Sequence, residues 1–312
     1  MAHSYRLLAA LIFSSIVLFW PPLTFFALIP IVLLYCLKGP RYAIGGILFA
    51  ALAIWLLSGI TLISLIFLLI VGLPALVMGI LMKKDTAAGH TIVLSTAFLL
   101  GCLILLIIIL EQVGQLNFSL EIQRIMRDSL DKAYQFYKNR GIGTEELALI
   151  RRNSWRLLRI LDLIWPALLV ISIWSFVYLD YILSGKMLRR FSLSVRSLPV
   201  LSQWHCPEWL VWVFIIPSGL LVGDKVFKLS QSHGWYLGVV NVLVLISFVY
   251  FIQGLGIADF YLRKAKAGKL PQVLFYFLVA LNRDLWIILM FFGLLDTWVD
   301  WRKLNKRIVE EK

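Results

Sequence analysis

Ionisable and amide side chains interrupt the last apolar stretch of this chain. They are Gln253, Asp259, Asn282, Arg283, Asp284, Asp296 and Asp300. An ionisable side chain at bilayer depth costs about 2.5–3.5 kcal/mol on insertion scales, so it usually faces a partner or a water-filled cavity. Such residues could hold a small polar ligand or relay protons, or they could fix helix register as a buried ion pair.

Arg283 is the residue around which a ligand site would form. Neighbours on a helix do not face each other, so Arg283 needs an acid other than Asp284, and Asp180 or Asp259 on another segment is the natural choice. We predict a small polar pocket for an anionic or zwitterionic ligand, lined by Asp180, Gln253, Asp259, Asn282, Arg283 and Asp284. The alternative is a buried ion pair that only fixes helix register, and the residue types and their spacing favour this alternative.

A second group of charges follows at the end of this stretch. Asp296, Asp300 and Arg302 stand beside Trp298 and Trp301. Paired tryptophans are typical of a helix that leaves the membrane through the headgroup layer. We predict that the three charged residues either bond locally or contribute to docking of a partner protein.

Enzyme chemistry finds no support in the sequence. The chain has four histidines, and it contains no HExxH, GxSxG or Walker motif that would place a nucleophile, base or phosphate. Its three cysteines, Cys36, Cys102 and Cys206, form no CxxC pair. We therefore expect no catalytic residue, no metal site and no cofactor.

The composition indicates a membrane protein. Of the 312 residues, 61% are hydrophobic and 15% are charged, whereas soluble domains have about 45–50% and about 25%. The net charge of +13 comes from Lys and Arg placed mainly between apolar runs, where such residues set topology and meet anionic lipid headgroups. We expect no nucleic-acid partner.

Residues 1–110 are predicted to form the N-terminal transmembrane helices. A retained first helix and a second short one share 7–37, with Pro21 and Pro22 at the turn between them. A hairpin of 42–57 and 60–82 follows, turned at Ser58 and Gly59, and 90–110 forms a fifth span. A cytoplasmic N-terminus would place the basic turns after 37 and 82 in the cytoplasm as well, as the positive-inside rule requires.

Residues 111–156 have a different character. Apolar residues recur at helical spacing from Phe118 to Tyr137, and charged residues fill the opposite face. Gly141 and Gly143 should end this helix, and Thr144, with Glu145 and Glu146, should begin a second one. We predict an extramembrane amphipathic hairpin, either a lid or docking element or a cover for its own bundle.

Residues 157–312 are predicted to form the C-terminal transmembrane helices with a basic tail. The expected spans are 157–183, interrupted at Pro166, then 209–222 and 235–262. One crossing by 271–298 would leave the basic tail outside, so we favour a re-entrant or hairpin form bent near Asn282. The predicted fold is thus an all-α bundle of about eight to ten membrane helices.

Several short motifs carry a family resemblance. They are Gln253-Gly254-Leu255, Phe260-Tyr261-Leu262-Arg263, Gly293-Leu294-Leu295-Asp296, Asp300-Trp301-Arg302, Pro207-Glu208-Trp209 and Leu188-Arg189-Arg190. With them the chain resembles the YybS-like family of uncharacterised bacterial integral membrane proteins over nearly its whole length. The resemblance implies a multi-pass protein of the bacterial inner (cytoplasmic) membrane.

That family is similar to the S components of energy-coupling-factor vitamin transporters, and more distantly to the rod-shape protein MreD. In S components a small-residue face of the first helix docks on a coupling subunit. Ala10 and Ser14, with Ala9 and Ser15, would supply such a face here, or would pack within the bundle itself. The resemblance implies a small-molecule binding or transport component; the alternative is a membrane scaffold for envelope or cell-division proteins.

Overall fold

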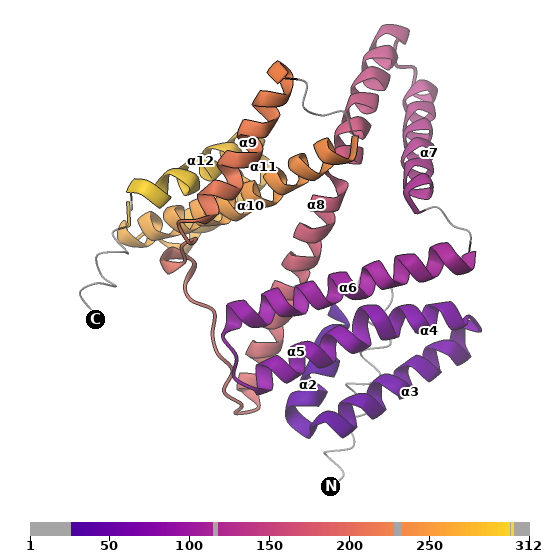
Figure 1. The fold of residues 1–312 in the computed structure, drawn as a ribbon, viewed down its shortest axis with the longest axis vertical. Helices are drawn as coiled ribbons and strands as arrows, with labels where there is room; N and C mark the ends of the chain where they lie inside the picture. The colour runs from indigo at the N-terminus through magenta and orange to yellow at the C-terminus, as the bar shows by residue number, and fades with distance from the viewer. Residues whose placement is uncertain (1–25, 115–117, 228–232, 300, 303–312) are drawn as a thin grey trace. The chain divides into compact units, whose positions relative to one another are not determined.

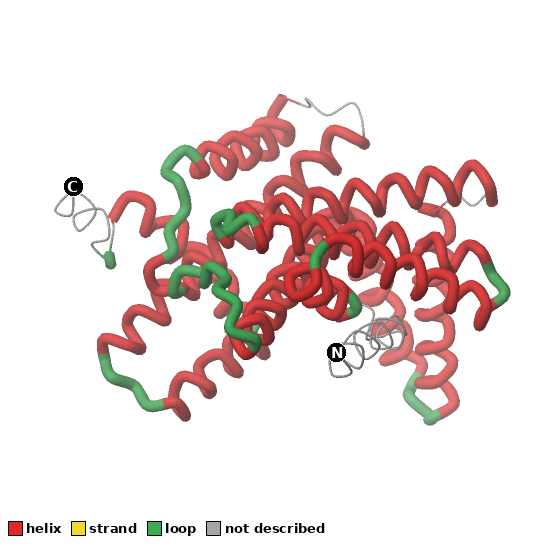
Figure 2. The backbone as a smooth tube through the Cα atoms, turned by 90° about the horizontal axis from the view of Figure 1, so that it is seen from below, coloured by secondary structure: helices red, strands yellow, loops and turns green. Residues whose placement is uncertain are grey.

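The computed structural model describes residues 26–114, 118–227, 233–299 and 301–302 (Figure 1). Every regular element in these ranges is a helix, and no strand occurs among them (Figure 2). The predicted all-α class is therefore confirmed. The first predicted helix, with Ala10 and Ser14, and Asp300 lie outside the described residues.

The helices cover most of the described sequence. In chain order they are α2 (Leu28–Lys38), α3 (Pro40–Ser58), α4 (Thr61–Phe67), the π-helical turn η2 (Leu68–Gly72), α5 (Leu73–Lys83), α6 (Ala88–Gly114), α7 (Phe118–Asn139), α8 (Thr144–Arg190), the short 3₁₀ helix η3 (Leu201–Gln203), α9 (Leu210–Phe227), α10 (His233–Lys264), α11 (Lys269–Leu281) and α12 (Arg283–Val299).

Five described helices are long and apolar enough to cross a membrane: Pro40–Ser58, Thr61–Lys83, Ala88–Val113, Glu145–Arg190 and Gly234–Lys264. The bent pair α11 and α12 is a sixth span if it is counted as one, and Leu28–Lys38 and Leu210–Gly223 are shorter apolar helices. The chain is thus a multi-pass membrane protein.

The chain divides into two compact units. Unit 1 comprises Met1–Arg151 and Ser172–Leu198, and unit 2 comprises Arg152–Ile171 and Pro199–Lys312. This division follows packing, whereas the predicted division at 110 and 156 separates membrane from extramembrane segments. Those predicted boundaries remain predictions.

Unit 1 is built around a predicted helical hairpin. α3 ends at Ser58, and Gly59 adopts a φ of +67°, a left-handed conformation that glycine reaches without strain. The continuous helix Thr61–Lys83 then returns beside α3, and α5 packs against α2 and α6. A core of buried apolar residues from α2, α3, α5, α6 and the last third of α8 holds the unit together.

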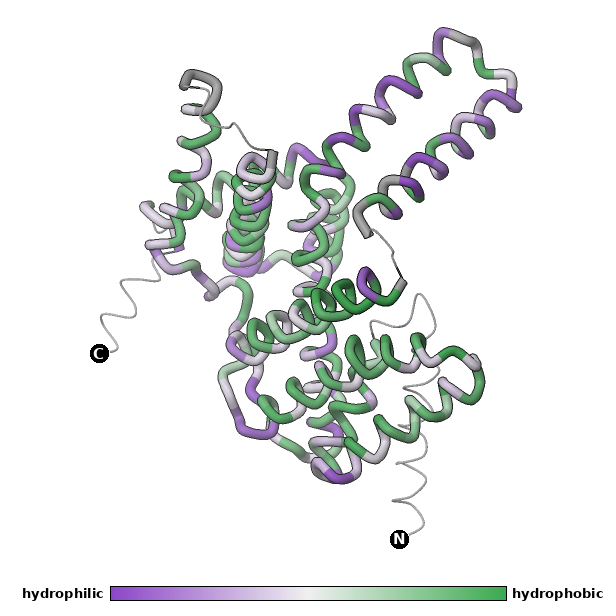
Figure 3. Tube along the Cα trace, turned by 45° about the vertical axis from the view of Figure 1, so that its right-hand side comes forward, coloured by the Kyte–Doolittle hydropathy of each residue, from purple (hydrophilic) through white to green (hydrophobic). Residues whose placement is uncertain are grey.

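The region between α6 and the sixth span agrees with the prediction only in part. α7 ends at Asn139 and α8 begins at Thr144, as expected, with Gly143 in the N-cap position. However, the second arm of the predicted hairpin and the sixth span are one continuous helix of 47 residues. Figure 3 shows the change within it: polar residues dominate the first turns of α8, and hydrophobic residues dominate later.

In unit 2, α10 and α12 cross with their backbones almost in contact. A Cβ atom on Gly254 would lie 1.9 Å from the carbonyl oxygen of Leu289, and one on Gly293 would lie 2.0 Å from that of Tyr250. Only glycine permits this approach, which is typical of close helix pairs in membranes. α9 and η3 also pack against α10.

The last two helices are sharply bent. α11 ends at Leu281 and α12 begins at Arg283, with 106° between their axes. The predicted bend near Asn282 is therefore present. The preference for a re-entrant or hairpin form over one broken crossing remains a prediction.

Candidate functional site

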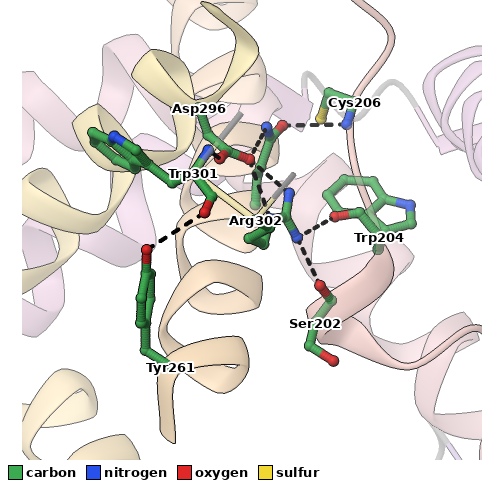
Figure 4. A network of polar contacts seen from close by, with 8 residues as sticks. Ser202, Trp204, Cys206, Tyr261, Asp296, Trp301 and Arg302 are labelled. Carbon is green, nitrogen blue, oxygen red and sulfur yellow. Dashed lines mark hydrogen bonds and ion pairs between the residues drawn. The ribbon is translucent and has the colours of Figure 1, made fainter. Parts of the chain in front are cut away.

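A buried arginine forms the centre of a polar network in unit 2 (Figure 4). Arg302 is 2% exposed. Its Nε and Nη2 donate to Asp296 Oδ2 at 3.2 and 2.7 Å, and its Nη1 donates to the carbonyl oxygens of Ser202 and Trp204 at 3.1 and 2.8 Å. The guanidinium therefore joins the end of α12 to the connector that contains η3.

Gln253 links α10 to the same network. Its side chain is 1% exposed. The amide nitrogen donates to Asp296 Oδ2 at 3.3 Å, and the amide oxygen accepts the backbone N–H of Cys206 at 3.2 Å. Asp296 also accepts the backbone N–H of Trp301 at 3.0 Å. The carboxylate thus has both oxygens bonded, as a buried charge requires.

Cys206 lies in the connector beside this network, and its side chain is buried. Burial raises the pKa of the Cys206 thiol to about 12, because the thiolate loses its hydration; Arg302 lowers it and Asp296 raises it by smaller amounts. This thiol is therefore a poor nucleophile near neutral pH.

The network joins residues that we had predicted for two different roles. Gln253 is predicted to line a ligand pocket, whereas Asp296 and Arg302 are predicted either to bond locally or to contribute to docking of a partner protein. The structure instead buries all three together, where the protein's own groups occupy their hydrogen-bonding atoms. We interpret the network as structural, because a buried pair does not present itself to a partner protein.

Asp259 lies one to two turns further along α10. It is 5% exposed, and its carboxylate accepts Arg263 Nε at 2.8 Å and the hydroxyl of Tyr276 on α11 at 3.4 Å. Its partners among the described residues are thus Arg263 and Tyr276. The expected pairing with Arg283 is not what the structure shows.

Asn282, Arg283 and Asp284 lie together at the bend between α11 and α12, and all three are exposed. The side-chain oxygen of Asn282 accepts the backbone N–H of Asp284 at 2.9 Å, which caps the start of α12. Arg283 Nη2 lies 3.6 Å from Asp284 Oδ1. Contrary to the prediction, these two neighbours pair, because at a helix end the long arginine side chain can fold back.

Asp180 belongs to unit 1, whereas Asp259 and Arg283 belong to unit 2. It is 1% exposed, and its Oδ1 atom has no hydrogen-bond partner. Asp180 therefore differs from Asp259 and Asp296, whose carboxylates are bonded by nearby donors.

Sequence reasoning missed Asn241 on α10. Its side-chain oxygen accepts the N–H of Ala167 and its nitrogen donates to the carbonyl of Leu163, each at 2.8 Å. These are the two backbone groups that one turn of α8 would pair with each other, next to Pro166. An asparagine within an apolar span and a proline within another were the available signals.

Comparisons with known proteins place the chain among membrane proteins. A family model described as "Predicted membrane protein (DUF2232)" matches residues 7–297. A Bacillus subtilis (strain 168) protein described as "Uncharacterized protein YybS" is 24% identical over 216 residues, which cover 68% of this chain and 67% of that protein. No solved structure matches the chain.

Proposed function

Because this chain belongs to the DUF2232 family of predicted membrane proteins, we propose that it is a non-enzymatic, small-molecule-binding component of a transport system in the bacterial inner membrane. The role resembles that of S components of energy-coupling-factor transporters. Such a component contributes the binding site, and partner subunits with ATPase activity would supply the driving force. Anionic lipid headgroups would contact its basic turns.

One observation carries the proposal: the exposed polar break between two apolar helices. α11 and α12 together have the length and apolarity of a span, yet they bend by 106° at Asn282. Irregular backbone at membrane depth is tolerated where it lines an aqueous cavity or is covered by protein. Broken helices of this kind commonly form the substrate sites of transporters.

The charges at the break suggest the ligand class. The side chains of Arg283 and Asp284 are 87% and 75% exposed, so their mutual pairing leaves most of their hydrogen-bonding capacity available. A guanidinium beside a carboxylate suits a ligand that carries both charges, or an anion held by the arginine. We therefore propose an anionic or zwitterionic small molecule.

Native mass spectrometry of the full chain, extracted in mild detergent, tests this function. We expect wild type to retain a small molecule that Arg283→Ala loses. Arg152→Ala is the matched control, since it removes an exposed arginine from α8 and should leave the molecule bound. A ligand retained equally by all three proteins, or by none, would contradict the proposal.

The alternative function, a membrane scaffold for envelope or cell-division proteins, has its own supporting observation. Large apolar side chains are exposed on α7 and the first turns of α8, where Ile125, Phe136 and Leu149 are 58%, 53% and 59% exposed. An exposed apolar set rimmed by charges is typical of an interaction surface. Co-purification of a protein partner that Ile125→Glu releases, without any bound small molecule, would favour the scaffold.

A further inference from the structure

Among the described residues of unit 1, four buried polar atoms on two helices have no hydrogen-bond partner. They are Ser95 Oγ and Thr96 Oγ1 on α6, and Asp180 Oδ1 and Ser184 Oγ on α8. The four residues are 1%, 6%, 1% and 0% exposed. Buried polar groups in proteins are nearly always bonded, so four exceptions in one unit require a physical explanation.

The buried hydroxyl of Thr91 and the half-buried hydroxyl of Ser64, also in unit 1, are both hydrogen-bonded. Thr91, one turn before Ser95 on α6, bonds through Oγ1 to the carbonyl of Ala87 at 3.3 Å and to Thr86 Oγ1 at 2.7 Å. Ser64 donates to the carbonyl of Ala51 at 2.8 Å. The unit therefore satisfies hydroxyl groups elsewhere, and the exceptions are concentrated on two helix faces.

Those two faces belong to the same core. Ser95 lies between Ile92 and Leu99 at spacings of three and four residues, and Ser184 lies between Tyr181 and Leu188 at the same spacings. These spacings place each serine on the helix face of its apolar neighbours. All four neighbours are members of one buried cluster, so the polar faces of α6 and α8 border the same core.

The four residues also lie at similar depth. Arg196, which follows α8, pairs with Asp85, which precedes α6, at 3.1 Å, and its carbonyl accepts the Tyr181 hydroxyl at 2.6 Å. The start of α6 and the end of α8 therefore lie together. At 1.5 Å per residue, Ser95 and Thr96 lie about 10–12 Å from that end of α6, and Ser184 and Asp180 lie about 9–15 Å from that end of α8.

Among the described residues, no basic side chain forms an ion pair with Asp180. None of the ion pairs found among the described residues includes it. Two bases on the adjoining segments have other contacts: Arg196 pairs with Asp85, and Lys83 lies over the ring of Tyr35. A buried carboxylate without a basic partner requires a bound cation or a proton.

We infer that Asp180, Ser184, Ser95 and Thr96 form a binding site for a small monovalent cation, for which Na⁺ is the probe. Carboxylate and hydroxyl oxygens are hard donors of the kind that alkali and alkaline-earth cations take. One carboxylate balances one positive charge, whereas Ca²⁺ sites usually collect several carboxylates. This site lies in unit 1 and is separate from the α11–α12 bend in unit 2.

The test measures the unfolding midpoint of the full chain in mild detergent, with NaCl replaced stepwise by choline chloride at constant ionic strength. We expect Na⁺ to raise the midpoint saturably, by about 5 °C at a hundredfold excess over its Kd. Asp180→Asn should abolish the rise. Asp259→Asn and Ser64→Ala, which change a paired carboxylate and a bonded hydroxyl, should retain it.

Three results would overturn the cation site: an equal midpoint in Na⁺ and choline, an undiminished rise in Asp180→Asn, or a midpoint that responds to pH but not to Na⁺. If Asp180→Asn does not fold, the test uses the double variant Ser95→Ala, Ser184→Ala. The Na⁺ concentration that gives half of the rise in midpoint should increase in this variant, and an unchanged concentration would contradict the inference. Arg283→Ala should keep the Na⁺ response. A failure of the cation site can therefore be distinguished from a failure of the ligand site at the α11–α12 bend.

Discussion

At the residue scale, unit 2 contains a buried ion pair on which its stability should depend. Arg302 and Asp296 have side chains that are 0% and 4% exposed, and each has several bonds to the other or to neighbouring groups. An ion pair of this kind contributes little net stability compared with apolar residues, but removing one partner leaves the other charge buried and unpaired. The network should therefore respond very differently to single and double substitutions.

Arg302→Met should lower the free energy of unfolding by about 3–5 kcal/mol, because it leaves the Asp296 carboxylate buried without a basic partner. Asp296→Leu combined with Arg302→Met should recover most of that loss. Denaturant titration in detergent measures both. Arg196→Met serves as control, because it breaks an exposed pair whose contribution should be about 0–1 kcal/mol. Equal losses in the single and double variants would exclude the ion-pair account.

Cys206 gives a test that depends on pH. Because burial raises the pKa of this thiol to about 12, the thiolate fraction should grow about tenfold per pH unit from pH 7 to pH 10. In a variant with Cys36 and Cys102 replaced by Ala, the alkylation rate should follow that increase without a plateau. An exposed cysteine, with a pKa of about 8.5, levels off above pH 9, and such a plateau here would contradict burial.

At the element scale, two of the contacts that α10 makes involve special residues: the glycine crossing with α12 and the Asn241 bridge to α8. The first is steric and the second is polar. Both lie within apolar segments, where the hydrophobic effect does little to select one helix pairing over another. Small residues and interhelical hydrogen bonds therefore determine which helices pack together.

Gly254→Ala and Gly293→Ala should each destabilise the chain by about 1–3 kcal/mol or more, because the added methyl group meets backbone that cannot move aside. Gly238→Ala on the same α10 helix is the matched control. A Cβ atom there has no neighbour within 4 Å, so this change should be neutral or stabilise by about 0.5–1 kcal/mol. Thermal unfolding in detergent compares the three, and similar midpoints would refute the close crossing.

Asn241→Leu should cost about 1–2 kcal/mol by removing the amide that bonds Leu163 and Ala167. The loss should shrink in a Pro166→Ala background, since a regular helical turn lets those two backbone groups pair with each other. A double-mutant cycle measures this coupling. If the changes in unfolding free energy from the two substitutions simply add, Asn241 acts independently of Pro166.

At the scale of the whole molecule, the direction of each span relative to the membrane is decided by charge. The basic turns after α2 and α5 fit one side of the bilayer, while the α11–α12 pair decides where the basic tail lies. A re-entrant or hairpin form returns the tail to the side of Lys266. One broken crossing would send it to the opposite side.

We expect Lys266 and Lys306 to lie on the same, cytoplasmic side. Single-cysteine variants Lys266→Cys and Lys306→Cys, in a background without native cysteines, should both react with a membrane-impermeant maleimide in inverted vesicles and neither in intact cells. Labelling of the two positions from opposite sides would establish one broken crossing instead.

Much of the fold follows from local patterns in the sequence. The apolar runs, the Gly59 turn, the gap before Thr144 and the bend at Asn282 all agree with the structure, because each depends on residues a few positions apart. The second hairpin arm and the span expected from 157 form one continuous helix, since a helix passes from a polar to an apolar surrounding without a break when its backbone hydrogen bonds continue.

The amino-acid sequence alone shows that this is an all-α, multi-pass membrane protein, because solvent preference and helix formation are set by composition and by near neighbours. Which polar residues meet is known only from how the helices pack. Gln253 bonds Asp296, 43 positions away, and Arg302 reaches Ser202 across 100, while Asp180 keeps an unbonded oxygen. Such pairings depend on which helix faces pack together, and that information is distributed over the whole chain.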